Sequence, residues 1–304
     1  MTVGDAPGWS TGDAGTLVHG YLAAQVAELT AHEPGVRARD PEAVHDMRVA
    51  TRRLRSALST FRPVLRRERT DPLRAALRRW GQVLGEVRDV DVSHAALAAL
   101  LDEEPAGLVL GPVRDRLGAD RAAALDAAHE HVVAELDGLA AAHLRADLAA
   151  LVADPPLAPE AARPAAEVLP ARARREFRRL RHALRAARDE PGGPARDHEL
   201  HEARKAARRA RYAAEVLVPA AGQPAERSAR DAQRVQDLLG AHQDAVVERA
   251  VLRRLAAEAT ATGESAFSYG RLHEQAHERA VDAERRLPRA ARRVTDPDRL
   301  DWTR

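Results

Sequence analysis

Two stretches of the sequence place a histidine ahead of basic side chains at helical spacing. The first, VHDMRVATRRLRSAL, covers residues 44–58, and the second, LHEARKAARRARYAA, covers residues 200–214. At 100° per residue, one face of each helix is apolar and the opposite face is basic. The basic face of the first stretch holds His45, Arg48, Arg52 and Arg55, with Arg53 beside them. That of the second holds His201, Arg204, Lys205, Arg208, Arg211 and Tyr212.

These basic faces favour anion binding. Arginines at positions i, i+4 and i+7 of a helix repel one another unless an anion lies among them. Guanidinium groups bond two phosphate oxygens in parallel, and each charged bond contributes roughly 1.5–3 kcal/mol. Two such faces around one groove would hold an extended polyanion tightly and in a salt-sensitive way. The alternative is that the arginines form a solvated face, paired with acids on neighbouring helices.

Other charged residues give weaker signals. In LGEVRDVDV, Arg88 stands beside Asp89 and Asp91, which we expect to pair with arginines rather than to bind Mg²⁺. A bound phosphate could raise the pKa of His45 and of His201 and make each a hydrogen-bond donor; the alternative is that both make structural polar contacts. There is no HExxH motif, so we expect no metal and no cofactor. A third arginine series, which could extend the groove or be a solvated surface, contains Arg174, Arg178, Arg181, Arg185 and Arg188.

Composition predicts an all-α protein. Of 304 residues, 45% are hydrophobic but only 3% aromatic, so the core must be built from Leu, Val and Ala, and the chain is rich in strong helix formers. The net charge is only +2, so the clustered arginines indicate a localised anion site. The absence of cysteine fits a reducing compartment. With neither a signal-peptide pattern nor a membrane-length apolar run, we expect a cytoplasmic protein without a membrane partner.

The helices that carry these faces belong to a repeat. At an offset of 156 residues, His45 matches His201, and the first arginine series matches the second. The motifs LGEVRD and LGAHQD match at an offset that is one residue shorter. A duplicated helical unit follows, which predicts two antiparallel bundles side by side. The expected divisions are a flexible segment at 1–15, a first repeat at 16–153, a proline-rich linker at 154–170, a second repeat at 171–294 and a tail at 295–304.

Local signals place the first helices. We expect one from Thr16 to His32, closed by Pro34-Gly35, and a second beginning near Pro41 behind an Asp40 cap. Gly85 marks either a bend or a close contact in the third.

Four motifs in order, VHDMRVATRRLRSALSTFRPVL, VLGEVRDVDV, LHEARKAARRARYAAEVL and LLGAHQDAVV, resemble the CHAD family of α-helical domains from about residue 16 to 294. The resemblance implies two pseudo-twofold-related four-helix bundles, a basic central cavity, binding of inorganic polyphosphate and association with polyphosphate granules. It does not imply hydrolysis, because no ExExK signature of a triphosphatase is present. The residues it assigns to the cavity are His45, Arg48, Arg52, Arg53, Arg55, His201, Arg204, Lys205, Arg208, Arg209 and Arg211.

The leading hypothesis is a non-enzymatic polyphosphate-binding protein. A nucleic-acid (RNA) backbone binder using the same arginines is the main alternative; it is disfavoured because Tyr212 is the only aromatic residue on a basic face. An enzyme of phosphate metabolism would need a metal or a positioned base that the sequence does not offer. An interaction scaffold with solubilising arginines is the remaining alternative. The sequence leaves the oligomeric state open.

Overall fold

The computed structural model describes residues 12–303, and this part of the chain is all-α, as predicted. It holds no named strand, only two isolated β-bridges. No helix in residues 12–303 is both long and apolar enough to cross a bilayer. The α-helices are α1 (Ala14–Arg37), α2 (Pro41–Thr60), α3 (Arg67–Glu103), α4 (Val113–Asp137), α5 (Leu139–Ala153), α6 (Ala165–Val168), α7 (Pro170–Asp189), α8 (Gly193–Ala221), α9 (Gln223–Ala261) and α10 (Phe267–Val294).

The start of α2 and the end of α1 show how local sequence sets the first turn of the chain. Asp40 caps α2, because its carboxylate accepts a hydrogen bond from the Glu42 backbone N–H at 2.9 Å. The prediction that α1 closes before Pro34-Gly35 is wrong: the helix continues to Arg37. A Cβ on Gly35 would lie 2.5 Å from the Cβ of Ala43, so glycine lets α2 approach the last turn of α1 closely. Packing thus outweighs the helix-ending signal.

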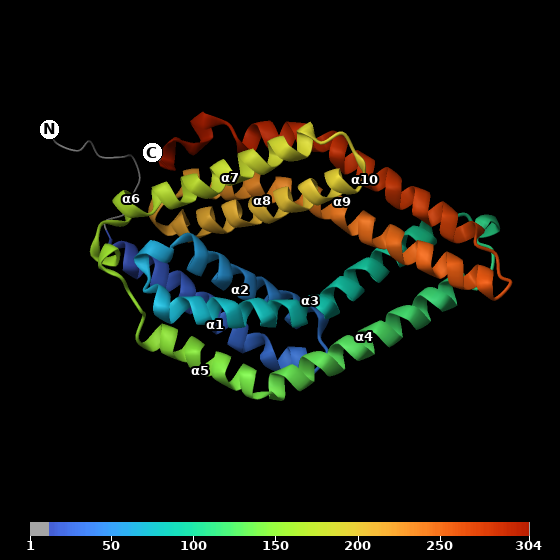
Figure 1. The fold of residues 1–304 in the computed structure, drawn as a ribbon, viewed down its shortest axis with the longest axis horizontal. Coiled ribbons are helices and arrows are strands. Elements are labelled where there is room, and N and C mark those ends of the chain that lie inside the picture. Colours follow the sequence, from blue (N-terminus) through green and yellow to red (C-terminus); the bar gives the residue numbers. More distant parts are fainter. Residues whose placement is uncertain (1–11, 304) are drawn as a thin grey trace.

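The two halves of the chain lie one above the other (Figure 1), with α2 and α3 of the first half facing α8 and α9 of the second. The second half has four long helices, α7–α10, whereas the first divides its last helix into α4 and α5 at Gly138. The main core includes Val216 and Leu217 of α8 together with residues of α1–α5. The two halves therefore share a core beside the α2–α8 contact.

The long hairpins α3–α4 and α9–α10 extend away from this contact and meet at their far ends (Figure 1). A separate apolar cluster there includes Leu97 of α3 and Leu252 of α9. Ion pairs reinforce it: Arg116 lies 2.6 Å from Glu264. The two halves are thus joined at two places, beside the α2–α8 contact and at the far ends of the hairpins.

The segments expected as the linker and the tail form short helices and hydrogen bonds, as does the end of the segment expected to be flexible. Residues 154–170 include the 3₁₀ helix Pro159–Ala162 and α6, and the Ala14 N–H donates to the Arg163 carbonyl at 2.9 Å. Asp13 caps α1 through the Thr16 N–H at 2.6 Å, so residues 13–15 are not flexible; residues 1–11 lie outside the described residues. In the tail, the 3₁₀ helix Pro297–Thr303 places the Trp302 Nε1 2.9 Å from the Ser228 Oγ. Each segment is held because it has hydrogen-bond partners on a neighbouring helix.

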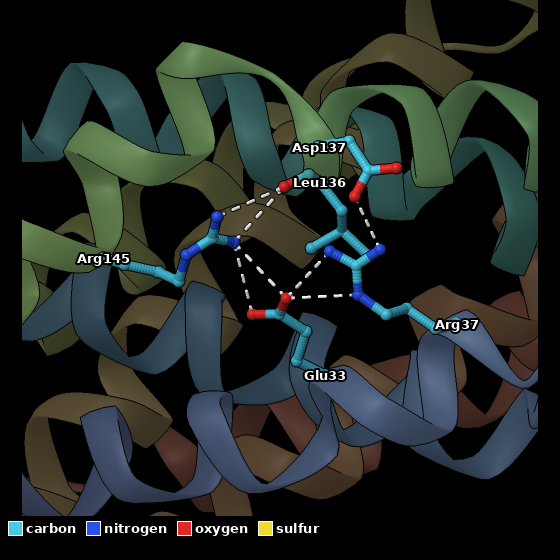
Figure 2. Close-up of polar contacts among 5 residues, drawn as sticks. All are labelled: Glu33, Arg37, Leu136, Asp137 and Arg145. Carbon is cyan, nitrogen blue, oxygen red and sulfur yellow. Dashed lines mark hydrogen bonds and ion pairs between the residues drawn. The ribbon is translucent and has the colours of Figure 1, made fainter.

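At the edge of the first half, arginines pair with acids in the ordinary way. Glu33 of α1 lies between Arg37 and Arg145 (Figure 2). Its Oε1 is 3.1 Å from Nη2 of Arg37 and 3.3 Å from Nη1 of Arg145. Arg37 also bonds Asp137 of α4 at 2.7 Å, and Arg145 donates to the Leu136 carbonyl. This group, the Glu33 network, fastens the α4–α5 junction to α1.

Candidate anion-binding site

The contact between α2 and α8 brings equivalent arginines of the two repeats together. Arg52 and Arg208, which match at the 156-residue offset, lie close enough for the charge of Arg52 to lower the pKa of Arg208. The flanking Arg48 and Arg204, which also match, act on both. Equivalent arginines of the two repeats are therefore neighbours at the α2–α8 contact. We call these four residues the arginine seam.

The seam arginines are half-buried, and of the four only Arg48 has a carboxylate, that of Asp89, within ion-pair distance among residues 12–303. Burial lowers the pKa of Arg52 and of Arg208, and the neighbouring guanidinium groups lower it further. Within residues 12–303 no carboxylate lies in ion-pair distance of Arg52, Arg204 or Arg208. The Nε atoms of Arg52 and Arg204 are buried without a hydrogen-bond partner. Buried charge of one sign without partners is unfavourable, so the arrangement favours an anion.

Glycines in α3 and α9 make room for the two flanking arginines. A Cβ on Gly85 would lie 3.5 Å from Nη2 of Arg48, and one on Gly240 would lie 3.7 Å from Nε of Arg204. Of the two roles considered for Gly85, the close contact is confirmed, because α3 continues through it to Glu103. The repeated Leu-Gly motif therefore gives each guanidinium a surface of helix backbone to lie against.

Aspartates stand at the margins of the seam. Asp89 pairs with Arg48 at 2.9 Å, and Arg88 pairs with Asp91 at 2.9 Å, so the predicted role of these acids in ion pairs is confirmed. At the position equivalent to Asp89, burial raises the pKa of Asp244, although Arg204 lowers it. Among residues 12–303, no group of three or more potential ligands could hold a metal ion.

Glu215 of α8 neutralises two arginines that the sequence assigns to the cavity. Its carboxylate accepts from Nε of Arg53 at 3.1 Å and from Nε of Arg211 at 2.8 Å. The Tyr212 ring lies beneath both guanidinium groups, at 5.8 and 4.9 Å. Tyr212 is 2% exposed, so its prediction as a ligand-contacting residue is wrong: the ring supports the arginines from below. The i, i+4 spacing of Arg211 and Glu215 was the available signal for this pair.

The remaining candidates lie around the seam or away from it. Arg209 faces Glu176 at 3.5 Å, and Lys205 is paired with Glu202. Arg55 has no carboxylate within ion-pair distance in the described residues, and the charges of two arginines of α3, Arg78 and Arg74, lower its pKa after the larger effect of burial. Arg181 and Arg185 do not reach the seam; they line a hollow between α7 and α10.

The histidines stand one turn before the seam on each helix. Burial lowers the pKa of His45, and Arg88, Arg52 and Arg48 lower it further, outweighing Asp46. Burial also lowers the pKa of His201, whose Nδ1 lies 2.9 Å from Oε1 of Gln243. The pKa of each ring therefore lies below its ordinary value in the free protein, and a bound anion would favour protonation of both rings.

Comparison with known proteins adds an independent finding. The family model of the CHAD domain matches residues 20–253. The curated uncharacterized proteins Rv2226 and MT2285, from two strains of Mycobacterium tuberculosis, are each 32% identical over 289 residues, which is 92% of this chain and 54% of theirs. The chain thus spans about half the length of the curated relatives it matches.

Two solved structures are similar in fold. The crystal structure of the CHAD domain from the plant Ricinus communis has a TM-score of 0.68 and 25% identity, covering 92% of each chain. PptA from Streptomyces chartreusis has a TM-score of 0.72 and 22% identity, covering 92% of this chain and 99% of that one. The second likeness concerns the fold alone.

Proposed function

This chain belongs to the CHAD family, and we propose that it binds inorganic polyphosphate along the arginine seam. The observation that carries the proposal is the half-buried arginine seam at the α2–α8 contact, in which Arg52, Arg204 and Arg208 have no carboxylate within ion-pair distance among residues 12–303. An anion there would receive charge-assisted hydrogen bonds from both halves of the chain, each worth roughly 1.5–3 kcal/mol.

A linear polyanion suits the layout better than a single phosphate. The basic side chains continue from the seam past Arg48 towards His45 and, in the other direction along α2, towards Arg55, Arg74 and Arg78. A chain with one negative charge per phosphate would meet a guanidinium repeatedly along this course. Its affinity would fall steeply with salt, because every neutralised charge releases a counterion.

The burial of Tyr212 separates this proposal from the RNA alternative. Proteins that bind single strands stack bases on exposed aromatic rings, and here the one aromatic residue of the basic faces is covered by Arg53 and Arg211. A backbone-only interaction with RNA would remain weaker than binding of polyphosphate, whose charge density is higher.

We propose a binding role rather than catalysis. The seam consists of guanidinium groups, which keep their protons at neutral pH and cannot act as general bases. In the cell, such a protein would be a cytoplasmic component associated with polyphosphate granules.

The test is a titration with long-chain polyphosphate at physiological salt, with single-stranded RNA of equal total charge as competitor. We expect polyphosphate binding that RNA does not displace. Equal or stronger RNA binding would move the protein to the nucleic-acid class, and no binding of either would leave the arginines with a structural role.

A further inference from the structure

The third arginine series, on α7, forms a separate surface. It runs from Arg174 to Arg188, about 21 Å along the axis at 1.5 Å per residue. Arg178, Arg181 and Arg185 have no carboxylate within ion-pair distance in residues 12–303. Such a run of like charges is unfavourable without an acidic partner.

Two adjoining hollows lie beside this series. One, of about 430 Å³, lies between α7 and α10; the other, of about 170 Å³, lies between α7 and the C-terminal 3₁₀ helix. Both are lined by Arg181 and Thr295, so they form one groove along α7. We call it the α7–α10 groove.

The charge of the groove is almost entirely positive. Across from the α7 arginines, Arg292 of α10 also has no carboxylate within ion-pair distance in the described residues. The one carboxylate that lines the groove, Glu284, is already bound by Arg196 at 2.8 Å and by His242 at 3.3 Å. The groove therefore offers unpaired guanidinium groups along its length and no free acid among the described residues.

The floor of the groove is apolar, which distinguishes it from the arginine seam. It is formed by the outer edge of the core residues Phe177, Leu184, Leu200 and Leu287, each at most 9% exposed, together with the more exposed Pro288 and Leu300. A polyphosphate chain has no apolar groups and would leave this surface unused. A ligand that matches both features carries apolar side chains on one face and carboxylates on its flanks.

We propose that the α7–α10 groove is a docking site for an acidic amphipathic helix of a partner protein. Leucine-type side chains at positions i, i+3 or i+4, and i+7 would pack on the floor, and acidic residues beside them would pair with the α7 arginines. A groove of about 21 Å accommodates roughly four turns of such a helix. This site is independent of the proposed polyphosphate site, because the seam arginines do not line it.

The test uses a fluorescent synthetic helix of about 15 residues with leucines at i, i+4, i+7 and i+11 and glutamates at most other positions. A second peptide of the same charge carries serine in place of every leucine. Anisotropy at physiological salt should show the serine peptide binding the wild-type chain at least about tenfold more weakly, because it cannot use the floor.

Two variants of the groove and one matched control complete the design. Arg181→Glu with Arg185→Glu should weaken binding of the leucine peptide at least about tenfold, whereas Arg175→Glu with Arg227→Glu, the same charge change at exposed positions outside the groove, should alter it less than about twofold. Ala291→Trp, which fills the larger hollow without changing charge, should also weaken binding of the leucine peptide. This variant tests the groove if the charge-reversal variant does not fold.

Equal binding of the serine peptide, or equal losses in the groove and control reversals, would overturn the proposal in favour of unspecific attraction. Displacement of the leucine peptide by polyphosphate, with polyphosphate affinity itself lost in the groove reversal, would make the groove a polyanion site instead. If the variant Arg181→Glu with Arg185→Glu binds polyphosphate as tightly as the wild type does, the arginine seam and the α7–α10 groove are separate sites, and each proposal can be judged on its own.

Discussion

The Glu33 network and the arginine seam use the same side chain for opposite purposes. Around Glu33, Arg37 and Arg145 are partly exposed, at 37% and 43%, and a carboxylate lies within about 3 Å of each. In the seam, Arg52 and Arg208 are half-buried beside other arginines and have no carboxylate within ion-pair distance in the described residues. An arginine that is paired with a carboxylate holds two helices together. A partly buried arginine without a carboxylate destabilises the free protein, and a bound anion would offset that cost.

The largest effect should come from reversing charge at the seam. Arg48→Glu with Arg204→Glu removes two donors and places acids on the course of the polyanion, so we expect polyphosphate affinity to fall by more than about 100-fold, in line with two charge-assisted bonds. Isothermal titration measures the affinity and circular dichroism checks helicity. Arg175→Glu with Arg227→Glu is the control for net charge, and unchanged affinity in the seam variant would refute the site.

A smaller difference should separate two equivalent residues, Arg55 and Arg211. Arg211 is neutralised by Glu215, whereas Arg55 has only arginines as charged neighbours. We therefore expect Arg55→Gln to weaken polyphosphate binding by about five- to tenfold and Arg211→Gln by about twofold or less. The same two substitutions are then made in a Glu215→Gln variant. Without the carboxylate, Arg211→Gln should reduce polyphosphate affinity as much as Arg55→Gln does. Equal losses in the original background would contradict the role assigned to Glu215.

Binding should also depend on pH through the histidines. In the free protein the pKa of His45 and of His201 lies below its ordinary value of 6.5, and a bound anion raises both, so binding takes up protons. Affinity should increase as the pH falls through the pKa of the complex, and level off below that of the free protein, by a few-fold between about pH 8 and pH 6. Titrations of the His45→Gln, His201→Gln variant should lack this increase; an unchanged pH profile would exclude the histidines.

The smallest effect belongs to the Glu33 network. Because Arg145 is partly exposed, Arg145→Met should lower the free energy of unfolding by no more than about 1 kcal/mol and leave polyphosphate affinity unchanged. Denaturant unfolding and the same titration measure both quantities. A loss of affinity would mean that arginines outside the seam contribute to binding.

The sequence predicted the central part of this arrangement because it is a property of periodicity and repetition. Helical spacing placed Arg48 and Arg52 on one face, and the 156-residue offset predicted that Arg204 and Arg208 would meet them. The all-α class followed from composition, and the pairing of Asp89 with an arginine was expected, although its partner, Arg48, lies on another helix.

What the sequence did not show depends on contacts between distant segments. The neutralisation of Arg53 by Glu215 joins residues 162 positions apart, and the burial of Tyr212 depends on helix packing that periodicity does not specify. The sequence left open whether the α7 arginines extend the groove or form a solvated surface, and only the structure shows that Arg181 lines a hollow beside α10. Likewise α1 passes its proline-glycine pair because Ala43 packs against Gly35.

The most direct test of the account replaces the two equivalent arginines of the seam, Arg52→Met with Arg208→Met, and follows thermal unfolding with and without long-chain polyphosphate. Because two half-buried charges without carboxylate partners are removed, the free variant should melt at a higher temperature than the wild type. Polyphosphate should raise the melting temperature of the wild type but hardly that of the variant. A variant that is less stable when free, yet stabilised by polyphosphate as much as the wild type, would contradict the claim that the seam is a binding site.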